Sequence, residues 1–219
     1  ARLITDAAWT NTDPIAYTDV MRQRTDERQT RRIVESATRE RGLPIVIETR
    51  PGLTVGEVAA GVRAARVRLA QQGRKLSYVV VDHLGKLRAT RDHRSRVNEI
   101  GEISQSLACL AKDEQVALLA LCQLNRAVEG RANKRPGLAD LRDSGDLEQD
   151  ADLVAFAFRP AYYLERTREN DPEAETERYA MLGQVKHDLE IIVAKNRNGP
   201  TGVIDLWIDI TANAVRNRH

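Results

Sequence analysis

The run YVVVD at residues 78–82 constrains the fold of this chain more than any other segment. β-Branched residues at consecutive positions favour a strand that is covered on both faces, as the strands of parallel sheets are. Apolar residues then recur at helical spacing over residues 97–113, and a second apolar run, VALLALCQL, follows at 116–124. This order of strand, helix and strand predicts an α/β fold whose crossover connections join parallel strands.

Other segments extend the predicted fold on both sides. Apolar periodicity and short apolar runs predict the helices 26–41 and 54–73 and the strands 44–48, 152–158, 189–194 and 202–209. Thr54 and Glu57 form a capping box that starts the second of these helices. An Asn-Gly-Pro turn joins the last two strands, which predicts a hairpin at the edge of the sheet. Residues 160–188 are dense in charge and predict an exposed excursion or a disordered loop.

Composition narrows the class of protein. A length of 219 residues suits one large domain or two small ones, and a formal net charge of +2 gives no argument for nucleic acid by itself. The longest apolar runs fall short of the roughly 20 residues that cross a bilayer. Cys109 and Cys122 lack the spacing of a zinc site or a disulfide framework. These features predict a soluble, cytoplasmic protein that does not associate with membranes.

Polar side chains lie at the ends of the two strands predicted at residues 78–82 and 116–124. Ligands of α/β sheets lie beyond the carboxyl ends of the strands, so Asp82 is placed to hold a magnesium ion through water. The alternative is an acid that caps a neighbouring loop. Gln123 and Arg126 follow the next strand, where a neutral amide can bind a terminal phosphate and change its posture when that phosphate leaves. A polar strand end that meets solvent fits the same residues.

Two segments carry the charge and the small residues that bind a phosphate backbone. Directly after the first strand stand Lys86, Arg88, Arg91, Arg94 and Arg96, with Asp92 as the one acid among them. Such a cluster attracts a nucleic-acid backbone through counterion release, although a solvated basic loop has the same composition. In residues 134–152, a Ser-Gly pair allows close approach of a phosphate to the backbone, while the composition alone indicates a loop.

The order of these segments resembles the RecA-like motor domain of the bacterial replicative helicases of the DnaB family. The strand that ends in Asp82 resembles a Walker B element, and ISQSLACLAKDEQVALLALCQLNR is similar to the family's next helix and strand. KRPGLADLRDSGDLEQDADLVAF resembles the family's most characteristic loop, and IIVAKNRNGPTG its closing hairpin. The resemblance implies a RecA-like P-loop NTPase core, with a mostly parallel sheet flanked by helices, a C-terminal edge hairpin, and the N-terminal part of the core absent.

The resemblance also implies a role for each candidate residue. Asp82 holds the water shell of Mg²⁺, and Gln123, with Arg126 beside it, links the γ-phosphate of ATP to the DNA side of the subunit. The residues implied to contact single-stranded DNA are Arg142, Asp143 and Gly145 in one loop and Lys86, Arg88 and Arg91 in another. Lys195 and Arg197 reach the γ-phosphate bound by a neighbouring subunit, whereas without the resemblance they indicate a charged hairpin edge in solvent.

The function implied is ATP-driven unwinding of duplex DNA by a hexameric ring that moves along single-stranded DNA, with a helicase loader and primase as further partners. No GxxxxGK[ST] sequence occurs in the chain, so we expect these residues alone to be inactive as an ATPase. Residues 1–219 are expected to form one truncated motor domain: a polar helical segment 1–42, a core 43–159, a charged excursion 160–188 and a hairpin 189–209. A recombinase or RadA-type ATPase, and a non-catalytic RecA-like module that binds DNA or a helicase, are the alternatives.

Overall fold

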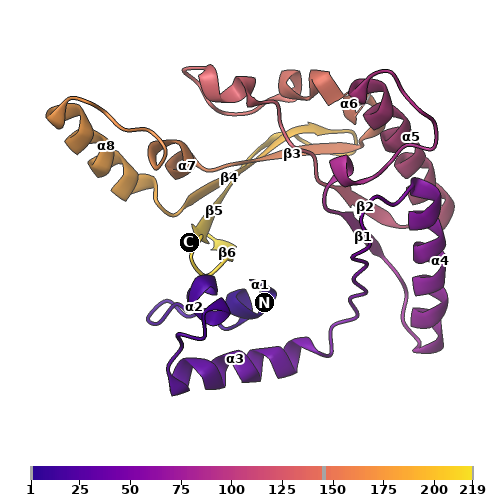
Figure 1. The fold of residues 1–219 in the computed structure, drawn as a ribbon, viewed down its shortest axis with the longest axis horizontal. Helices are drawn as coiled ribbons and strands as arrows, with labels where there is room; N and C mark the ends of the chain where they lie inside the picture. The colour runs from indigo at the N-terminus through magenta and orange to yellow at the C-terminus, as the bar shows by residue number, and fades with distance from the viewer. Residues whose placement is uncertain (1, 145–146, 219) are drawn as a thin grey trace. The chain divides into compact units, whose positions relative to one another are not determined.

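The computed structural model describes residues 2–144 and 147–218, without the side chains of residues 126 and 142–144 (Figure 1). The helices are α1 (Arg2–Ala7), α2 (Tyr17–Met21), α3 (Glu27–Glu40), α4 (Val55–Gln71), α5 (Arg96–Glu114), α6 (Leu147–Asp150), α7 (Pro160–Leu164) and α8 (Pro172–Val185). The strands are β1 (Tyr78–Val81), β2 (Ala117–Ala120), β3 (Leu153–Phe158), β4 (Asp188–Asn196), β5 (Gly202–Asp209) and β6 (Ala214–Asn217). Short 3₁₀ turns are η1 (Leu84–Lys86), η2 (Arg126–Gly130) and η3 (Leu138–Ser144).

The chain divides into two compact units. Unit 1 consists of Ala1–Leu43, Ala155–Val193 and Gly202–His219, and unit 2 of Pro44–Val154 and Ala194–Thr201. The predicted α/β class is confirmed, but the parallel part is small: β1 and β2 pair in parallel, whereas β4 pairs antiparallel with β5, and β5 with β6. Within residues 2–144 and 147–218, no helix is both long and apolar enough to cross a bilayer.

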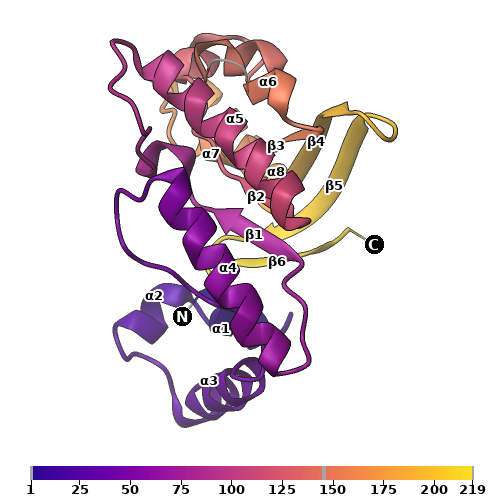
Figure 2. The same cartoon turned by 90° about the vertical axis from the view of Figure 1, so that its right-hand side faces the viewer.

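The core of unit 2 lies between the β1–β2 pair and the helices α4 and α5, which lie beside each other in Figure 2. Apolar side chains of α5 recur at spacings of three and four residues, and Ile103 and Leu107 among them are almost fully buried. Ser95 caps the start of α5 by accepting a hydrogen bond from the Val97 N–H, and Gln115 ends the helix in a left-handed conformation. The helix predicted at residues 97–113 is therefore confirmed.

One face of the β1–β2 pair stays exposed. The exposed fractions of Tyr78, Val80 and Leu119 are 74%, 60% and 56%. Their neighbours Val81 and Leu118 point the other way, into the core, because strand side chains alternate between faces. The prediction of strands covered on both faces is wrong for the described chain, since α4 and α5 pack on the same side.

An ion-pair cluster joins α4 to α5. The carboxylate of Glu114, 6% exposed, accepts from Arg63 Nε at 2.6 Å and from Arg66 Nη1 at 2.7 Å. Replacing Glu114 by Ala is expected to lower the free energy of unfolding by about 2 kcal/mol, because it removes two charge-assisted hydrogen bonds but leaves arginines that water can reach. Urea denaturation measures the change. Asp113→Ala, at the exposed neighbouring position, is the control, and an equal loss in both variants would contradict the cluster's role.

Most residues of the four-stranded sheet, in the order β3-β4-β5-β6, belong to unit 1. Alternate residues of β3 are buried, among them Phe156 and Phe158. The predicted β4–β5 hairpin is confirmed by its antiparallel register, in which Ile191 is opposite Ile204. Its position differs from the prediction, because β6, which no sequence signal indicated, takes the edge beside β5.

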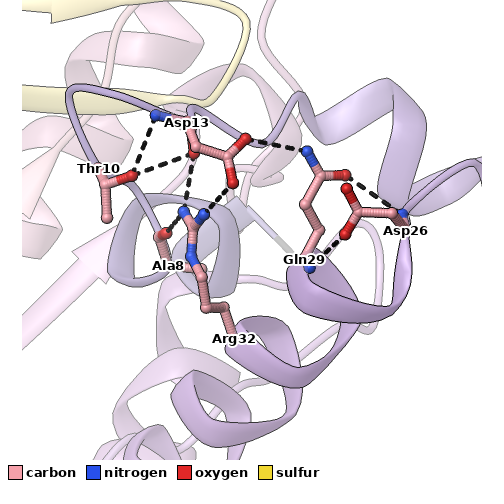
Figure 3. Close-up of polar contacts among 6 residues, drawn as sticks. All are labelled: Ala8, Thr10, Asp13, Asp26, Gln29 and Arg32. Atoms are coloured by element: carbon pink, nitrogen blue, oxygen red, sulfur yellow. Dashed lines mark hydrogen bonds and ion pairs between the residues drawn. The ribbon is translucent and has the colours of Figure 1, made fainter.

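Polar contacts hold the N-terminal helices of unit 1 together (Figure 3). Asp26 and Gln29 form a capping box at the start of α3, and Gln29 also donates to Asp13 at 3.1 Å. The guanidinium of Arg32 donates to the Asp13 carboxylate at 2.5 Å and to the carbonyl oxygens of Asp13 and Ala8. This network fixes α3 against the loop that follows α1. The bounds of α3 confirm the helix predicted at 26–41.

The structure differs from the predictions for two other segments. Residues 44–48 belong to no helix or strand of the described chain, and Ile47 is 76% exposed. A run of β-branched residues forms a strand only when a partner supplies the ladder of hydrogen bonds. Residues 160–188 were predicted to be an exposed excursion or a disordered loop. They contain the helices α7 and α8 and are largely exposed or half-buried, so only the second alternative is wrong. Arg178 holds these helices together by donating to Glu175 on its own helix and to the carbonyl of Leu164 at the end of α7.

Candidate functional site

Asp82 and Gln123 lie at the same edge of the β1–β2 pair. The parallel register pairs Val81 with Ala120, and the ladder continues as Leu121 N–H donates to the Val81 carbonyl at 2.9 Å. Asp82 is the first residue after β1, and Leu121 is the first residue after β2. Gln123 lies two residues beyond Leu121. Both side chains are exposed. The structure thus brings these two candidate residues to one carboxyl edge, where a ligand of an α/β sheet is expected.

The donor set at this edge suits a hydrated magnesium ion. Mg²⁺ retains several waters and is usually held by one or two carboxylates together with substrate phosphates. Asp82 supplies one exposed carboxylate, and among the residues that the structure describes no group of three His, Cys, Asp or Glu side chains could enclose a metal. Arg126 begins η2, where the Asn125 side chain accepts from the Ala127 N–H at 3.1 Å. The side chain of Arg126 lies outside the described residues.

Lys195 and Arg197, at the end of β4, are anchored to the short helix α6. The Lys195 ammonium donates to the carbonyl oxygen of Glu148. The Arg197 guanidinium donates to the carbonyl oxygen of Gln149 at 2.5 Å and to the Asp152 carboxylate at 2.9 Å. Unpaired carbonyls at the C-terminal end of a helix are natural acceptors for cations. The Arg197 side chain is nevertheless 50% exposed, so the hairpin tip is a surface feature.

Helix α6 follows directly on the segment that contains the candidate DNA loop. Gly145 lies outside the described residues, as do the side chains of Arg142 and Asp143, whose backbone belongs to η3. The start of the segment is fixed by Asp140, which accepts from the Gly137 N–H and from Arg131, both at 2.8 Å. Its end is fixed by a hydrogen bond of 2.6 Å from the Ser104 hydroxyl to Asp150 on α6.

Two of the basic residues after β1 have structural partners. Arg88 donates through Nε to the carbonyl of Gly52 at 2.6 Å, and Gly52 adopts a φ of +65° that favours glycine. Arg96 donates to the carbonyl of Gly85 at 2.9 Å and to Glu99 at 2.5 Å. The guanidinium of Arg88, a candidate DNA contact, is therefore engaged in holding the turn before α4.

Three other basic residues of this segment face solvent. Lys86, Arg91 and Arg94 are exposed, and no hydrogen bond or ion pair to another described residue holds their side chains. Three exposed cations within nine residues, next to a sheet edge that carries Asp82, form a surface able to attract a phosphate backbone. Lys86 and Arg91 are two of the candidate DNA contacts, and Arg94 belongs to the same basic cluster predicted from the sequence.

Sequence reasoning missed Glu102, a residue of α5 that holds this segment. One carboxylate oxygen accepts from the Thr90 N–H at 2.8 Å, and the other lies 2.5 Å from His93 Nε2. The hydrogen bond from His93, followed by that from the Thr90 N–H, lowers the pKa of Glu102 from its ordinary value. No local pattern marks such a residue, because its partners lie 12 and 9 positions away in the chain.

Most of the chain is similar in sequence to known proteins. A family model described as the DnaB-like helicase C terminal domain matches residues 2–216. The replicative DNA helicase DnaB of Rickettsia typhi (strain ATCC VR-144 / Wilmington) is 43% identical over 157 residues, which are 69% of this chain and 31% of that protein. The replicative DNA helicase DnaC of Bacillus subtilis (strain 168) is 40% identical over 163 residues, which are 74% of this chain and 31% of that protein.

Solved structures share the fold over the whole chain. The structure of a DnaB-like replicative helicase and its interactions with primase has a TM-score of 0.80 and 28% sequence identity, covering 100% of this chain and 47% of that chain. The structure of an ATPase domain has the same TM-score of 0.80 and covers 100% of this chain and 69% of that chain. The chain spans about a third (31%) of the length of the curated relatives it matches.

Proposed function

Because the chain belongs to the DnaB-like helicase C terminal domain family, we propose that it is the greater part of the ATPase motor of a replicative DNA helicase. In this proposal the complete protein forms a hexameric ring, hydrolyses ATP between subunits, moves along single-stranded DNA and separates the duplex at the replication fork. The observation that carries the proposal is the common carboxyl edge of β1 and β2, which brings Asp82 and Gln123 to one place. Heterologous contacts that close into a ring allow each site to combine residues of two neighbours.

We assign the nucleotide chemistry to residues of two subunits. Asp82 orients the waters of Mg²⁺, and the metal, when bound, neutralises charge on the β- and γ-phosphates of ATP. The Gln123 amide donates to the γ-phosphate, and Arg126 lies beside the nucleotide. Lys195 and Arg197 of the neighbouring subunit would approach the same phosphate. Charge spreads over the phosphoryl oxygens in the transition state, and a planar guanidinium stabilises that charge through paired hydrogen bonds.

The proposal requires a phosphate cradle that these residues do not contain, since no GxxxxGK[ST] occurs among them. We propose that polypeptide outside the 219 residues supplies it in the complete protein. The test is to purify the complete protein and measure ATP hydrolysis with and without single-stranded DNA, together with strand displacement from a forked duplex. DNA-stimulated hydrolysis supports the proposal. DNA binding without any hydrolysis would support the non-catalytic module instead.

We assign the DNA contacts to two loops of unit 2. Lys86 and Arg91 bind the backbone of single-stranded DNA from the loop after β1, with Arg88 supporting that loop. Arg142, Asp143 and Gly145 contact the same strand from the segment before α6. A helicase loader and a primase are the protein partners in this proposal, and the protein acts in the cytoplasm, where the chromosome of a bacterium is replicated.

The two loops can be tested by the dependence of DNA binding on salt. Arg91→Ala is expected to weaken binding of the complete protein to oligothymidylate and to reduce the slope of log K against log salt by about 0.7, because one phosphate contact of a single strand is lost. Arg142→Ala is expected to do the same from the second loop. Arg68→Ala, on the exposed face of α4, is the control. An unchanged slope in Arg91→Ala would remove that residue from the interface.

A further inference from the structure

The basic loop after β1 is bonded to Glu102 at two points, and each lies directly before an exposed arginine. Glu102 accepts from the Thr90 N–H at 2.8 Å, one residue before Arg91. Its other oxygen lies 2.5 Å from His93, one residue before Arg94. The carboxylate of Glu102 therefore fixes the backbone of the loop at Thr90 and the side chain of His93. Arg91, between these two residues, and Arg94, after them, stay exposed.

The carboxylate itself is turned toward the protein. The side chains of Glu102 and His93 are each 23% exposed, so water reaches little of the pair. Helix α5, which carries Glu102, is anchored in the core by Ile103, which is 0% exposed. The loop is thus attached to a rigid element through the residue next to one of the most buried side chains of unit 2.

We propose that Glu102 is a positioning residue for nucleic acid, whose carboxylate holds the loop 88–95 so that Arg91 and Arg94 are presented to a phosphate backbone. This inference rests on the proposed function and adds a residue to its DNA interface. A negative charge near a bound polyanion lowers affinity if charge alone acts. The same residue raises affinity if it orders the loop before binding, because the complex then loses less conformational freedom.

These two effects have opposite signs, and three substitutions separate them. Glu102→Ala removes both hydrogen bonds and the charge, and is expected to weaken binding of oligothymidylate by about three- to tenfold, the range for one or two side chains that must be ordered on binding. Glu102→Gln removes the charge but keeps an oxygen that accepts from Thr90 N–H and an amide that bonds His93, and is expected to bind at least as tightly as the wild type. Asp92→Asn removes a charge in the same loop but leaves the bonds of Glu102 to Thr90 and His93 intact. It is expected to strengthen binding by about twofold.

The experiment uses the complete protein, with affinities measured by fluorescence anisotropy at one fixed salt concentration. Hydrogen exchange of residues 89–94 provides a second readout, and it should speed up in Glu102→Ala while the exchange of β1 and α5 stays unchanged. Tighter binding by Glu102→Ala than by the wild type would overturn the inference. If Arg91→Ala also left binding unchanged, Arg91 would be removed from the DNA interface of the proposed function. A loss of binding in Arg91→Ala but not in Glu102→Ala would leave that interface standing and remove only the positioning role of Glu102.

Discussion

Replacing Arg197 by Ala is expected to lower ATP turnover by the complete, assembled protein about a thousandfold while single-stranded DNA binding is retained. A guanidinium supplied from a neighbouring subunit stabilises the transferring phosphoryl group, and its loss leaves that charge uncompensated. In the structure the guanidinium bonds to Asp152 and to the Gln149 carbonyl but is half exposed. An exposed ion pair contributes only about 0–1 kcal/mol, so Arg197 can exchange these partners for a phosphate at small cost.

Steady-state hydrolysis at saturating DNA measures the effect of this substitution. Asp152→Asn is the matched control, because it removes the negative charge of one resting partner of Arg197 but leaves the guanidinium, and its turnover is expected to stay close to that of the wild type. Full activity in Arg197→Ala would remove the residue from the catalytic site. Equal losses in both variants would indicate that the hairpin acts by structure and that its guanidinium never reaches a phosphate.

Replacing Asp82 by Asn is expected to lower ATP hydrolysis by about 10- to 100-fold and to raise the Mg²⁺ concentration required for half-maximal activity. Groups that hold a metal through its waters typically have effects of this size. An amide keeps the size of the side chain but lacks the charge that orients the waters. A titration of Mg²⁺ at fixed ATP measures both quantities. Asp92→Asn, an exposed acid ten residues further along the same segment, is the control and is expected to leave hydrolysis unchanged at saturating DNA.

The two inactive variants together test whether the site is shared between subunits. In rings assembled from equal amounts of Asp82→Asn and Arg197→Ala subunits, about a quarter of the interfaces combine an intact Asp82 with an intact Arg197. Mixing is therefore expected to restore hydrolysis above the level of either variant. A mixture that is no more active than its components would place both residues in the same subunit's site and contradict the arrangement proposed above.

Local signals predicted most elements of unit 2. The capping box at Thr54 and the periodic apolar residues placed α4 and α5 within about two residues of their observed ends, because these signals act over one or two helical turns. Residues 44–48 were predicted wrongly because a strand depends on a distant partner. Helix α8 was missed because it has no apolar stripe, although Asp171 followed by Pro172 is a helix-start signal that could have revealed it.

The candidate site was predictable only where it follows the ends of strands. Asp82 and Gln123 could be placed at one edge because parallel neighbours end at the same side of a sheet. The attachment of Lys195 and Arg197 to α6 spans more than 40 residues of chain and has no local pattern. The same holds for Glu102. The roles of all these residues stay predictions until the substitutions are measured.

The anchoring of Lys195 and Arg197 to α6 bears on how such a chain can change in length during evolution. Residues 147–152 end the segment of the candidate DNA loop and also carry the three acceptors of the hairpin, at Glu148, Gln149 and Asp152. An inserted or deleted residue there would rotate the short helix by about 100° and turn those acceptors away. The segment around α7 and α8 carries none of these three acceptors, so we expect a change of length there to leave the anchor of Lys195 and Arg197 in place.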